Sequence, residues 1–270
     1  MNSEPGVPKY QVEAFGPRTS RWAVSIFVLD EGARVQNQLR QMAAHRERAP
    51  ADYPDILVAD GGSTDGSLAP GFLRSVTVRA LLTKQSSGAL STQMRMAFDY
   101  ILKEGYEGVV VMDGNGKDGV EAIPGFVHAL RQGYDHVQGS RYLPGGFHEN
   151  TPFLRHWGVR LLHAPLISWA AGFPYTDTTN GFRAYSTGLL GDPRLAIFRP
   201  LFCAYEMHYY LAIEAPRLGF KCGELPVRRI YPKGTVPSKI KGWRGNYRLL
   251  KTLFNCCLGK YRPKLNDPSS

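Results

Sequence analysis

The sequence predicts an α/β fold with a mostly parallel central β-sheet flanked by helices, and two observations support this prediction. Short apolar runs of strand length recur along the first half of the chain. Between them lie segments in which apolar residues return at helical spacing. Such alternation is typical of βαβ units, whose strands run parallel. A chain of 270 residues can bury one substantial core, so we expect a single main domain.

The first elements follow this alternation in order. Trp22 to Leu29 is an apolar run that predicts a strand, and apolar residues at helical spacing from Val35 to Ala43 predict a helix after it. The next expected elements are strands over 55–59 and 76–82, an amphipathic helix over 90–102 and a buried strand over 108–112. From about Gly139 onwards clear strand patterns become fewer.

The residues that follow the predicted strands are expected to carry the chemistry. In open parallel sheets, ligands bind in the crevice beyond the carboxyl ends of the strands. Acidic residues stand at these positions in this chain, namely Asp30, Glu31, Asp60 and Asp113. We therefore expect a ligand site at that edge of the sheet.

Composition narrows the classes of protein and partner. The four cysteines form no Cys-x-x-Cys pair and no spacing typical of a zinc site, so neither a disulfide scaffold nor a zinc centre is expected. No run approaches the roughly 18 apolar residues that span a bilayer. Residues 1–20 lack the pattern of a secretory signal, which predicts a cytoplasmic protein. The net charge of +10 requires an anionic partner: nucleic acid, an acidic membrane face or a phosphorylated substrate.

Asp60 opens the first chemical motif, Asp60-Gly61-Gly62-Ser63-Thr64-Asp65-Gly66. A carboxylate at a strand end can accept a hydrogen bond from a nucleobase ring N–H, and small turn residues let a ligand approach closely. The alternative interpretation is a turn in which the aspartate only caps the main chain.

Asp113 opens the second motif, and the glycines at 114, 116 and 119 allow three interpretations of it. A dinucleotide fingerprint fits poorly, because a carboxylate before the first glycine would face the pyrophosphate. A calcium loop fits poorly, because Lys117 stands where an oxygen ligand is needed. The third interpretation is a strand-end carboxylate and amide, Asp113 and Asn115, that hold a divalent cation against a diphosphate. We favour the third.

Taken together, the motifs resemble the family 2 glycosyltransferases of the GT-A fold, close to the dolichol-phosphate mannosyltransferases and the bacterial polyprenyl-phosphate sugar transferases. The resemblance covers roughly Trp22 to Lys233. It rests on motifs in matching order, which are 24–31 (VSIFVLDE), the Asp60 turn, the Asp113 loop, 139–142 (GSRY), 176–183 (TDTTNGFR) and 223–227 (GELPV).

This resemblance implies a nucleotide-sugar site at the strand ends. The residues that it assigns to the nucleoside pocket are Phe27, Leu29, Glu31 and Asp60. It assigns Asp113 and Asn115 to the diphosphate and to a divalent cation, Mg²⁺ or Mn²⁺, and it makes Asp113 a catalytic residue.

Three departures from the family pattern bear on that site. The family usually has proline where Phe27 stands, asparagine where Asp30 stands and a second acid where Asn115 stands. Because Asn115 removes one negative charge, we expect weaker metal affinity, or partial neutralisation of the diphosphate by Lys117. Strict metal dependence is therefore not expected to follow from the resemblance alone.

The second half of the chain carries the residues implied for the acceptor. The resemblance places the acceptor phosphate on Ser140 and Arg141 of the GSRY motif and on later arginines, which we map onto Arg155 and Arg183. Guanidinium groups bind phosphate oxygens bidentately, which suits this role. Solvation at the surface is the alternative for Arg155, Arg228 and Arg229.

We divide the chain accordingly into a flexible tail over 1–20, a GT-A catalytic domain over 21–235 and a C-terminal segment over 236–270. The nucleotide-sugar half of the domain is expected over about 21–138 and the acceptor half over about 139–235.

In the C-terminal segment, apolar residues recur every three or four positions from Trp243 to Tyr261 between basic residues, which predicts a basic amphipathic helix. Such a helix binds an anionic membrane surface or packs on the domain, and Trp157 to Trp169 is a second candidate for lipid contact.

The leading functional hypothesis is inverting transfer of a sugar from a nucleoside diphosphate to a polyprenyl phosphate on the cytoplasmic membrane face. An ionised phosphate is already a nucleophile, so positioning and leaving-group stabilisation would dominate. The first alternative is transfer to a saccharide hydroxyl in surface-polysaccharide assembly, with a lipid-linked saccharide as a possible acceptor. This reaction needs a base, and Asp177 and Glu206 are the candidates. The second is a non-catalytic nucleotide-sugar-binding protein. Acids in the ligand crevice argue against a nucleic-acid partner.

Overall fold

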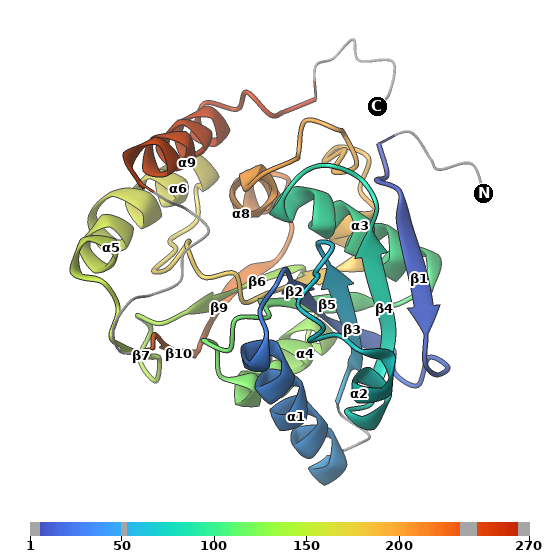
Figure 1. The fold of residues 1–270 in the computed structure, drawn as a ribbon. Coiled ribbons are helices and arrows are strands. Elements are labelled where there is room, and N and C mark those ends of the chain that lie inside the picture. Colours follow the sequence, from blue (N-terminus) through green and yellow to red (C-terminus); the bar gives the residue numbers. More distant parts are fainter. Residues whose placement is uncertain (1–5, 50–52, 233–241, 264–270) are drawn as a thin grey trace.

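The computed structural model describes residues 6–49, 53–232 and 242–263. Its central sheet has eight strands in the order β1-β4-β3-β2-β5-β8-β6-β9 (Figure 1). The bounds of these strands are β1 Tyr10–Ala14, β2 Trp22–Val28, β3 Asp55–Asp60, β4 Val78–Lys84, β5 Gly108–Asp113, β6 His136–Ser140, β8 Arg183–Ser186 and β9 Cys222–Pro226. A separate parallel pair consists of β7 (Phe147–Glu149) and β10 (Arg228–Ile230).

The predicted mostly parallel sheet is confirmed. Strands β4, β3, β2 and β5 are neighbours and run parallel, and β6 and β9 form another parallel pair. Antiparallel pairing enters through β1 at the edge and through β8, which lies between β5 and β6. In the register of the central strands, Phe27 lies opposite Asp113 and Val28 lies opposite Asp60. The strand-end acids therefore meet at one edge of the sheet, as predicted.

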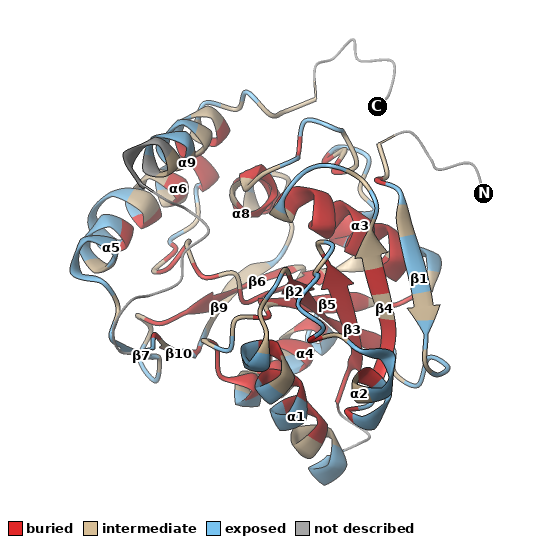
Figure 2. Cartoon of the chain, viewed as in Figure 1, coloured by how far each residue is buried: buried red, intermediate tan, exposed pale blue. Residues whose placement is uncertain are grey.

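Helices cover both faces of the sheet because each buries one apolar stripe. On one face lie α1 (Ala33–Arg48), α2 (Pro70–Ser75), the 3₁₀ turn η1 (Val120–Ala122) and α4 (Ile123–Arg131). On the other face lie α3 (Leu90–Lys103), α7 (Thr187–Leu190) and α8 (Glu206–Arg217). Helix α1 buries Val35, Leu39 and Met42, the spacing of one helical face. Figure 2 shows the buried residues concentrated in the sheet and on the inner sides of these helices.

A third group of helices packs beside the sheet. It consists of α5 (Phe153–Gly158), the π-helical turn η2 (Val159–His163), α6 (Ala164–Ala171) and α9 (Gly242–Cys257). Ile167 of α6 and Leu253 and Cys256 of α9 form a small core with Ile213 of α8. Figure 1 shows α5, α6 and α9 together, on the side of the molecule away from β1. Within the described part of the chain, no helix has the length and apolarity needed to span a membrane.

The N-terminal region differs from the flexible tail expected over residues 1–20. Tyr10–Ala14 forms β1, which pairs antiparallel with β4 at the edge of the sheet. The Tyr10 hydroxyl also donates to Asp99 on α3 at 2.6 Å. The segment is short and half polar, so its own sequence pattern does not predict a strand. Pairing with β4 provides the main-chain hydrogen bonds that stabilise it.

Candidate functional site

The loops after β2 and β3 are joined by hydrogen bonds from acidic side chains. Asp60 Oδ1 accepts hydrogen bonds from Ser63 N at 2.8 Å and Ser63 Oγ at 2.6 Å. Asp30 Oδ1 accepts a hydrogen bond from Thr64 N at 2.8 Å, and the main chain at Asp30 has a φ of 48°. Aspartate and asparagine tolerate this left-handed conformation better than most residues, which suits Asp30 to the turn. The capping interpretation of Asp60 is thus present in the structure. A contact of its second oxygen, Oδ2, with a nucleobase stays a prediction.

The other residues assigned to the nucleoside pocket lie along the same edge. Phe27 packs in the core on the α3 face, and its carbonyl accepts a hydrogen bond from Gly114 N at 2.9 Å. Leu29 is half-buried in the loop after β2. Glu31 forms an ion pair with Arg34 at 2.8 Å. Phe27 and Leu29 flank Val28, which lies opposite Asp60 in the sheet. Contact of these residues and of Glu31 with a nucleoside stays a prediction.

Asp113 ends β5 with its side chain 29% exposed. The loop that it opens is held by Gln38 of α1, which donates to the Asp113 carbonyl at 3.0 Å and accepts from Gly116 N at 2.9 Å. Gly181 faces the carboxylate, and a Cβ at that position would lie 3.2 Å from Asp113 Oδ1. The absence of a side chain at Gly181 therefore keeps space open beside the carboxylate.

This loop provides one carboxylate that suits a divalent cation. Asn115 Nδ2 donates to Asp113 Oδ2 at 3.2 Å, and Asn115 Oδ1 accepts from Lys117 N at 3.2 Å. Among the residues that the structure describes, no cluster of three or more His, Cys, Asp or Glu side chains could hold a metal ion by itself. The arrangement therefore fits a cation whose remaining ligands are diphosphate oxygens and water, as Mg²⁺ prefers. In this geometry Asn115 orients Asp113, and its role as a direct ligand stays a prediction.

A buried arginine adjoins this carboxylate. Arg229, just inside β10, lies 3.4 Å from Asp113 Oδ2, 3.2 Å from Asn180 Oδ1 and 2.5 Å from Asp118 Oδ2. Asp118 is fully buried, and burial raises the pKa of its carboxyl even though Arg229 opposes the shift. The pairing with Arg229 therefore compensates for the buried charge of Asp118 and connects β10 to the Asp113 loop.

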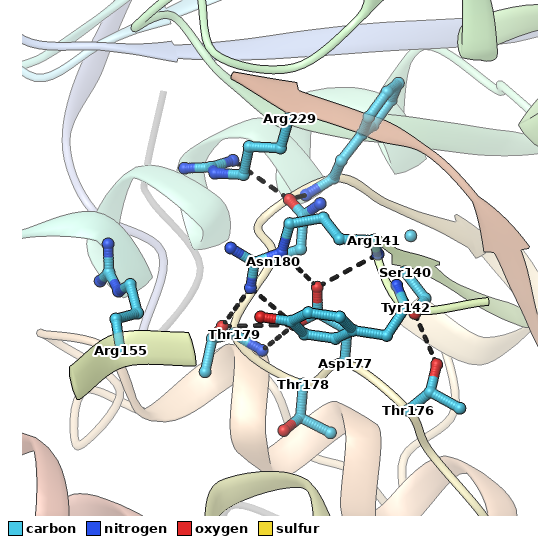
Figure 3. Close-up of polar contacts among 12 residues, drawn as sticks. Ser140, Arg141, Tyr142, Arg155, Thr176, Asp177, Thr178, Thr179, Asn180 and Arg229 are labelled. Carbon is cyan, nitrogen blue, oxygen red and sulfur yellow. Dashed lines mark hydrogen bonds and ion pairs between the residues drawn. The ribbon is translucent and has the colours of Figure 1, made fainter. Parts of the chain in front are cut away.

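Arg141 and Asp177 form a second buried ion pair. Arg141 Nε donates to Asp177 Oδ2 at 2.6 Å and Arg141 Nη2 donates to Oδ1 at 3.0 Å. Burial alone would raise the pKa of Asp177, but Arg141 outweighs burial and holds the pKa below its usual value. Figure 3 shows Arg141 between Asp177 and Thr179, with Arg229 against Asn180. The pairing favours a role for Asp177 in holding Arg141 over the role of a base.

The remaining residues predicted for the acceptor half have different surroundings. Ser140 is buried, and its hydroxyl hydrogen-bonds to Thr176 and accepts from Tyr142 N. Arg155, exposed on α5, donates to the Tyr231 hydroxyl at 3.2 Å.

The side chains of two predicted site residues, Arg183 and Glu206, form hydrogen bonds to main-chain groups. Arg183 is buried and donates to the carbonyls of Thr178, Asn180 and His208, so its guanidinium stabilises the loop before β8. Glu206 Oε2 accepts hydrogen bonds from Cys203 N and Ala204 N in the turn before α8. These contacts explain both residues structurally, and phosphate or substrate contacts for them stay predictions.

Sequence patterns did not single out several residues that build this site. Gln38 supports the Asp113 loop from a helix, and Tyr231 receives hydrogen bonds from arginines. A polar residue on the buried face of an otherwise apolar helix stripe was the available signal for Gln38. No local pattern identifies Tyr231, because its partners come from distant segments.

Comparisons with known proteins find sugar transferases among the relatives of this chain. The chain is 32% identical over 178 residues to polyprenol monophosphomannose synthase of Mycolicibacterium smegmatis, covering 64% of this chain and 65% of that relative. It is 29% identical over 192 residues to undecaprenyl-phosphate mannosyltransferase of Micrococcus luteus, covering 67% of this chain and 74% of the relative. No family model matches the chain.

Comparison with solved structures identifies the fold of this chain. Glucosyl-3-phosphoglycerate synthase of Mycobacterium tuberculosis, in complex with Mn²⁺ and UDP, superposes with a TM-score of 0.58 at 17% identity. The match covers 92% of this chain and 82% of that protein. The chain has the GT-A fold. The resemblance to the polyprenyl-phosphate sugar transferases that the motifs indicated is confirmed. Asp60 and Asp113 lie at the carboxyl ends of neighbouring parallel strands in this fold, and their contact with a nucleotide sugar stays a prediction.

Replacing Asp60 by alanine is expected to weaken nucleotide binding at the carboxyl ends of the parallel strands. If Asp60 accepts a nucleobase N–H, its loss leaves that donor unpaired, at a cost of about 1–3 kcal/mol. Calorimetric titration with the cognate nucleotide measures this change. Ser63→Ala is the matched control, since it removes a turn hydrogen bond to Asp60 and keeps the carboxylate. Equal losses in both variants would assign Asp60 to the turn alone.

Proposed function

We propose that this chain is an inverting glycosyltransferase that moves a hexosyl group from a nucleoside diphosphate sugar to a polyprenyl phosphate. One observation carries the proposal. The open carboxylate of Asp113, suited to a metal and a diphosphate, lies 3.4 Å from Arg229, which belongs to a cluster of basic side chains suited to a phosphate. Donor and acceptor groups would therefore meet at one edge of the sheet.

The donor side uses the strand-end residues. Asp60 and the loop after β2 would hold the nucleoside, and Asp113 would hold a divalent cation, Mn²⁺ or Mg²⁺. The mycobacterial structural neighbour was solved with Mn²⁺ and UDP, which supports a cation of this kind. Such a cation neutralises the charge that develops on a diphosphate leaving group. Lys117, two residues beyond Asn115 in the same loop, would add to this neutralisation.

The acceptor side uses the arginines. Arg141 is fixed by Asp177, which leaves Nη1 directed away from the pair, and Arg155 approaches from α5. A phosphate held there would attack the anomeric carbon from the side opposite the diphosphate, with inversion. Because the attacking oxygen is already ionised, the protein contributes position and electrostatic stabilisation rather than a base. The occupied carboxylates of Asp177 and Glu206 agree with this mechanism.

We also propose that the molecule binds an anionic membrane through the third helix group. Large apolar side chains are exposed there, with basic residues such as Arg155, Arg160, Arg248 and Lys251 among them. The apolar residues are Phe153, Leu154, Trp157, Leu161, Leu162 and Trp169 on α5 to α6, and Tyr247, Leu250, Phe254 and Leu258 on and just after α9. Figure 2 shows the exposed outer sides of α5 and α9. Apolar residues interleaved with basic ones suit the cytoplasmic face, whose anionic lipids attract such segments.

One side of the predicted C-terminal helix, α9, packs on the domain, and another side is exposed. Leu253 and Cys256 are buried against the domain, while Tyr247, Phe254 and Leu258 face outward. The parts of the 236–270 segment over 236–241 and 264–270 lie outside the described residues.

Replacing Leu154 and Leu161 together by aspartate is expected to reduce binding to anionic vesicles at least tenfold. The two side chains are 85% and 70% exposed, so the change removes membrane contacts without opening the core. Co-sedimentation with phosphatidylglycerol vesicles measures the effect. Val12→Asp, 42% exposed on β1 at the far edge of the sheet, is the control and should sediment like the unmodified protein.

The test of the proposed transfer is radiolabelled sugar partitioning into an organic phase with undecaprenyl or dolichyl phosphate as acceptor. UDP-, GDP- and dTDP-sugars are supplied in turn, with and without Mn²⁺ or Mg²⁺. Transfer to a saccharide hydroxyl alone, lost on Glu206→Gln, would replace the proposal by the hydroxyl-acceptor reaction. Nucleotide binding without any transfer would indicate a non-catalytic binding protein.

A further inference from the structure

The Tyr231 hydroxyl lies where several cationic groups converge. Tyr231 directly follows β10 and is only 1% exposed. Its hydroxyl accepts hydrogen bonds from Arg155 Nη1 at 3.2 Å and from Arg141 Nη1 at 3.4 Å. The Lys117 ammonium lies 5.2 Å from the centre of its ring, and the Arg229 guanidinium carbon lies 5.6 Å from it.

The cationic groups around this phenol outnumber the carboxylates that pair with them. Arg141 pairs with Asp177, and Arg229 pairs with Asp118 and Asp113. Arg155 and Lys117 have no carboxylate partner within the described ranges, so the cluster carries excess positive charge. Burial alone would raise the pKa of the Tyr231 phenol, but the three guanidiniums outweigh burial and hold the pKa below its usual value. An oxygen at this point is thus in surroundings that favour an anion.

We infer that the Tyr231 hydroxyl occupies the position of an acceptor phosphate oxygen and is displaced when a phosphate monoester binds. The inference rests on the proposed function for the identity of the acceptor. It adds that the Tyr231 hydroxyl competes with the acceptor phosphate for the same arginine donors. Phosphate oxygens accept stronger hydrogen bonds from guanidinium than a phenol does, so exchange is favourable once the acceptor is present. Without acceptor, the hydroxyl keeps the buried donors of Arg141 paired.

The experiment is a calorimetric titration of the full chain with inorganic phosphate, in buffer free of divalent cations so that the Asp113 site lacks its metal. Tyr231→Phe removes the competing oxygen and keeps the ring. We expect this variant to bind phosphate about tenfold more tightly than the unmodified protein. A tenfold change in affinity is the size expected for one hydrogen bond to a charged group.

Tyr142→Phe is the matched control. The Tyr142 ring also lies against the Arg141 guanidinium, at 5.2 Å, but its buried hydroxyl has no hydrogen-bond partner among the described residues. This variant should change phosphate affinity less than twofold. Equal or weaker phosphate binding by Tyr231→Phe would overturn the inference, since the hydroxyl would then be no competitor.

A second pair of variants keeps the test open if Tyr231→Phe does not fold. Arg155→Gln removes one guanidinium from the site and should weaken phosphate binding tenfold or more. Arg160→Gln, also exposed on the same run of helix, should leave it unchanged. Equal affinities in these two variants would remove Arg155 from the phosphate site and overturn the inference.

This readout is independent of sugar transfer. If Tyr231→Phe tightens phosphate binding but no polyprenyl phosphate accepts sugar, the proposed function fails and the phosphate site stands. If transfer to polyprenyl phosphate occurs and the titration shows no difference, the proposed function stands and the displacement is wrong.

Discussion

Asp113→Ala is expected to reduce sugar transfer at least a hundredfold while the protein stays folded. Asp113 is the partly exposed acid that ends β5, and its carboxylate is the strongest candidate to hold the cation beside the diphosphate. Losing that cation removes the stabilisation of the leaving group, an effect of several kcal/mol on the activation free energy. Initial rates with radiolabelled donor, together with thermal unfolding of the variant, measure both parts of the prediction.

Asn115→Asp is the companion variant. It places a second carboxylate next to Asp113 and is expected to retain transfer and to bind Mn²⁺ more tightly, because carboxylates are the preferred ligands of hard cations. Near-normal transfer by Asp113→Ala would show that this loop is not the metal and diphosphate site.

Arg141→Ala is expected to lower the free energy of unfolding by about 3–5 kcal/mol, because it leaves the buried carboxylate of Asp177 without its partner. Lipid-dependent transfer should fall with it, while nucleotide binding to the folded fraction survives. Arg141→Lys should recover only part of the loss, since lysine keeps the charge but lacks the planar fork that contacts both carboxylate oxygens. Denaturant unfolding and transfer assays measure these effects.

The double variant Arg141→Ala with Asp177→Ala isolates the pair. Removing both charges should cost less than the sum of the two single changes, because no buried charge is left unpaired. The folded-state pKa of Asp177 lies below its unfolded value of about 3.9. The contribution of the pair is therefore present above that pH and is lost as pH falls through the folded-state pKa. Additive losses at neutral pH would contradict the coupling.

Local patterns were sufficient to place the two strand-end acids of the proposed nucleotide-sugar site at one edge of the sheet. Asp60 and Asp113 each end an apolar strand, and parallel strands bring their carboxyl ends to one edge. The order of the strands and their register came only from the structure. The strand Tyr10–Ala14 was missed because a short, half-polar edge strand has no pattern of its own. It forms because β4 is available to pair with it.

The sequence by itself therefore determined the α/β class and the acids that meet at one edge of the sheet, since these depend on periodicity and on the ends of elements. Only the tertiary structure decided which charges meet. Arg141 and Asp177 are 36 positions apart, and Arg141 and Tyr231 are 90 positions apart. Their contacts arise where β6, the loop before β8 and the end of β10 come together. Strand β8 pairs antiparallel with β6 at this place. Arg141, Arg155 and Arg183 look alike in the sequence, and burial together with the groups that face each guanidinium distinguishes them.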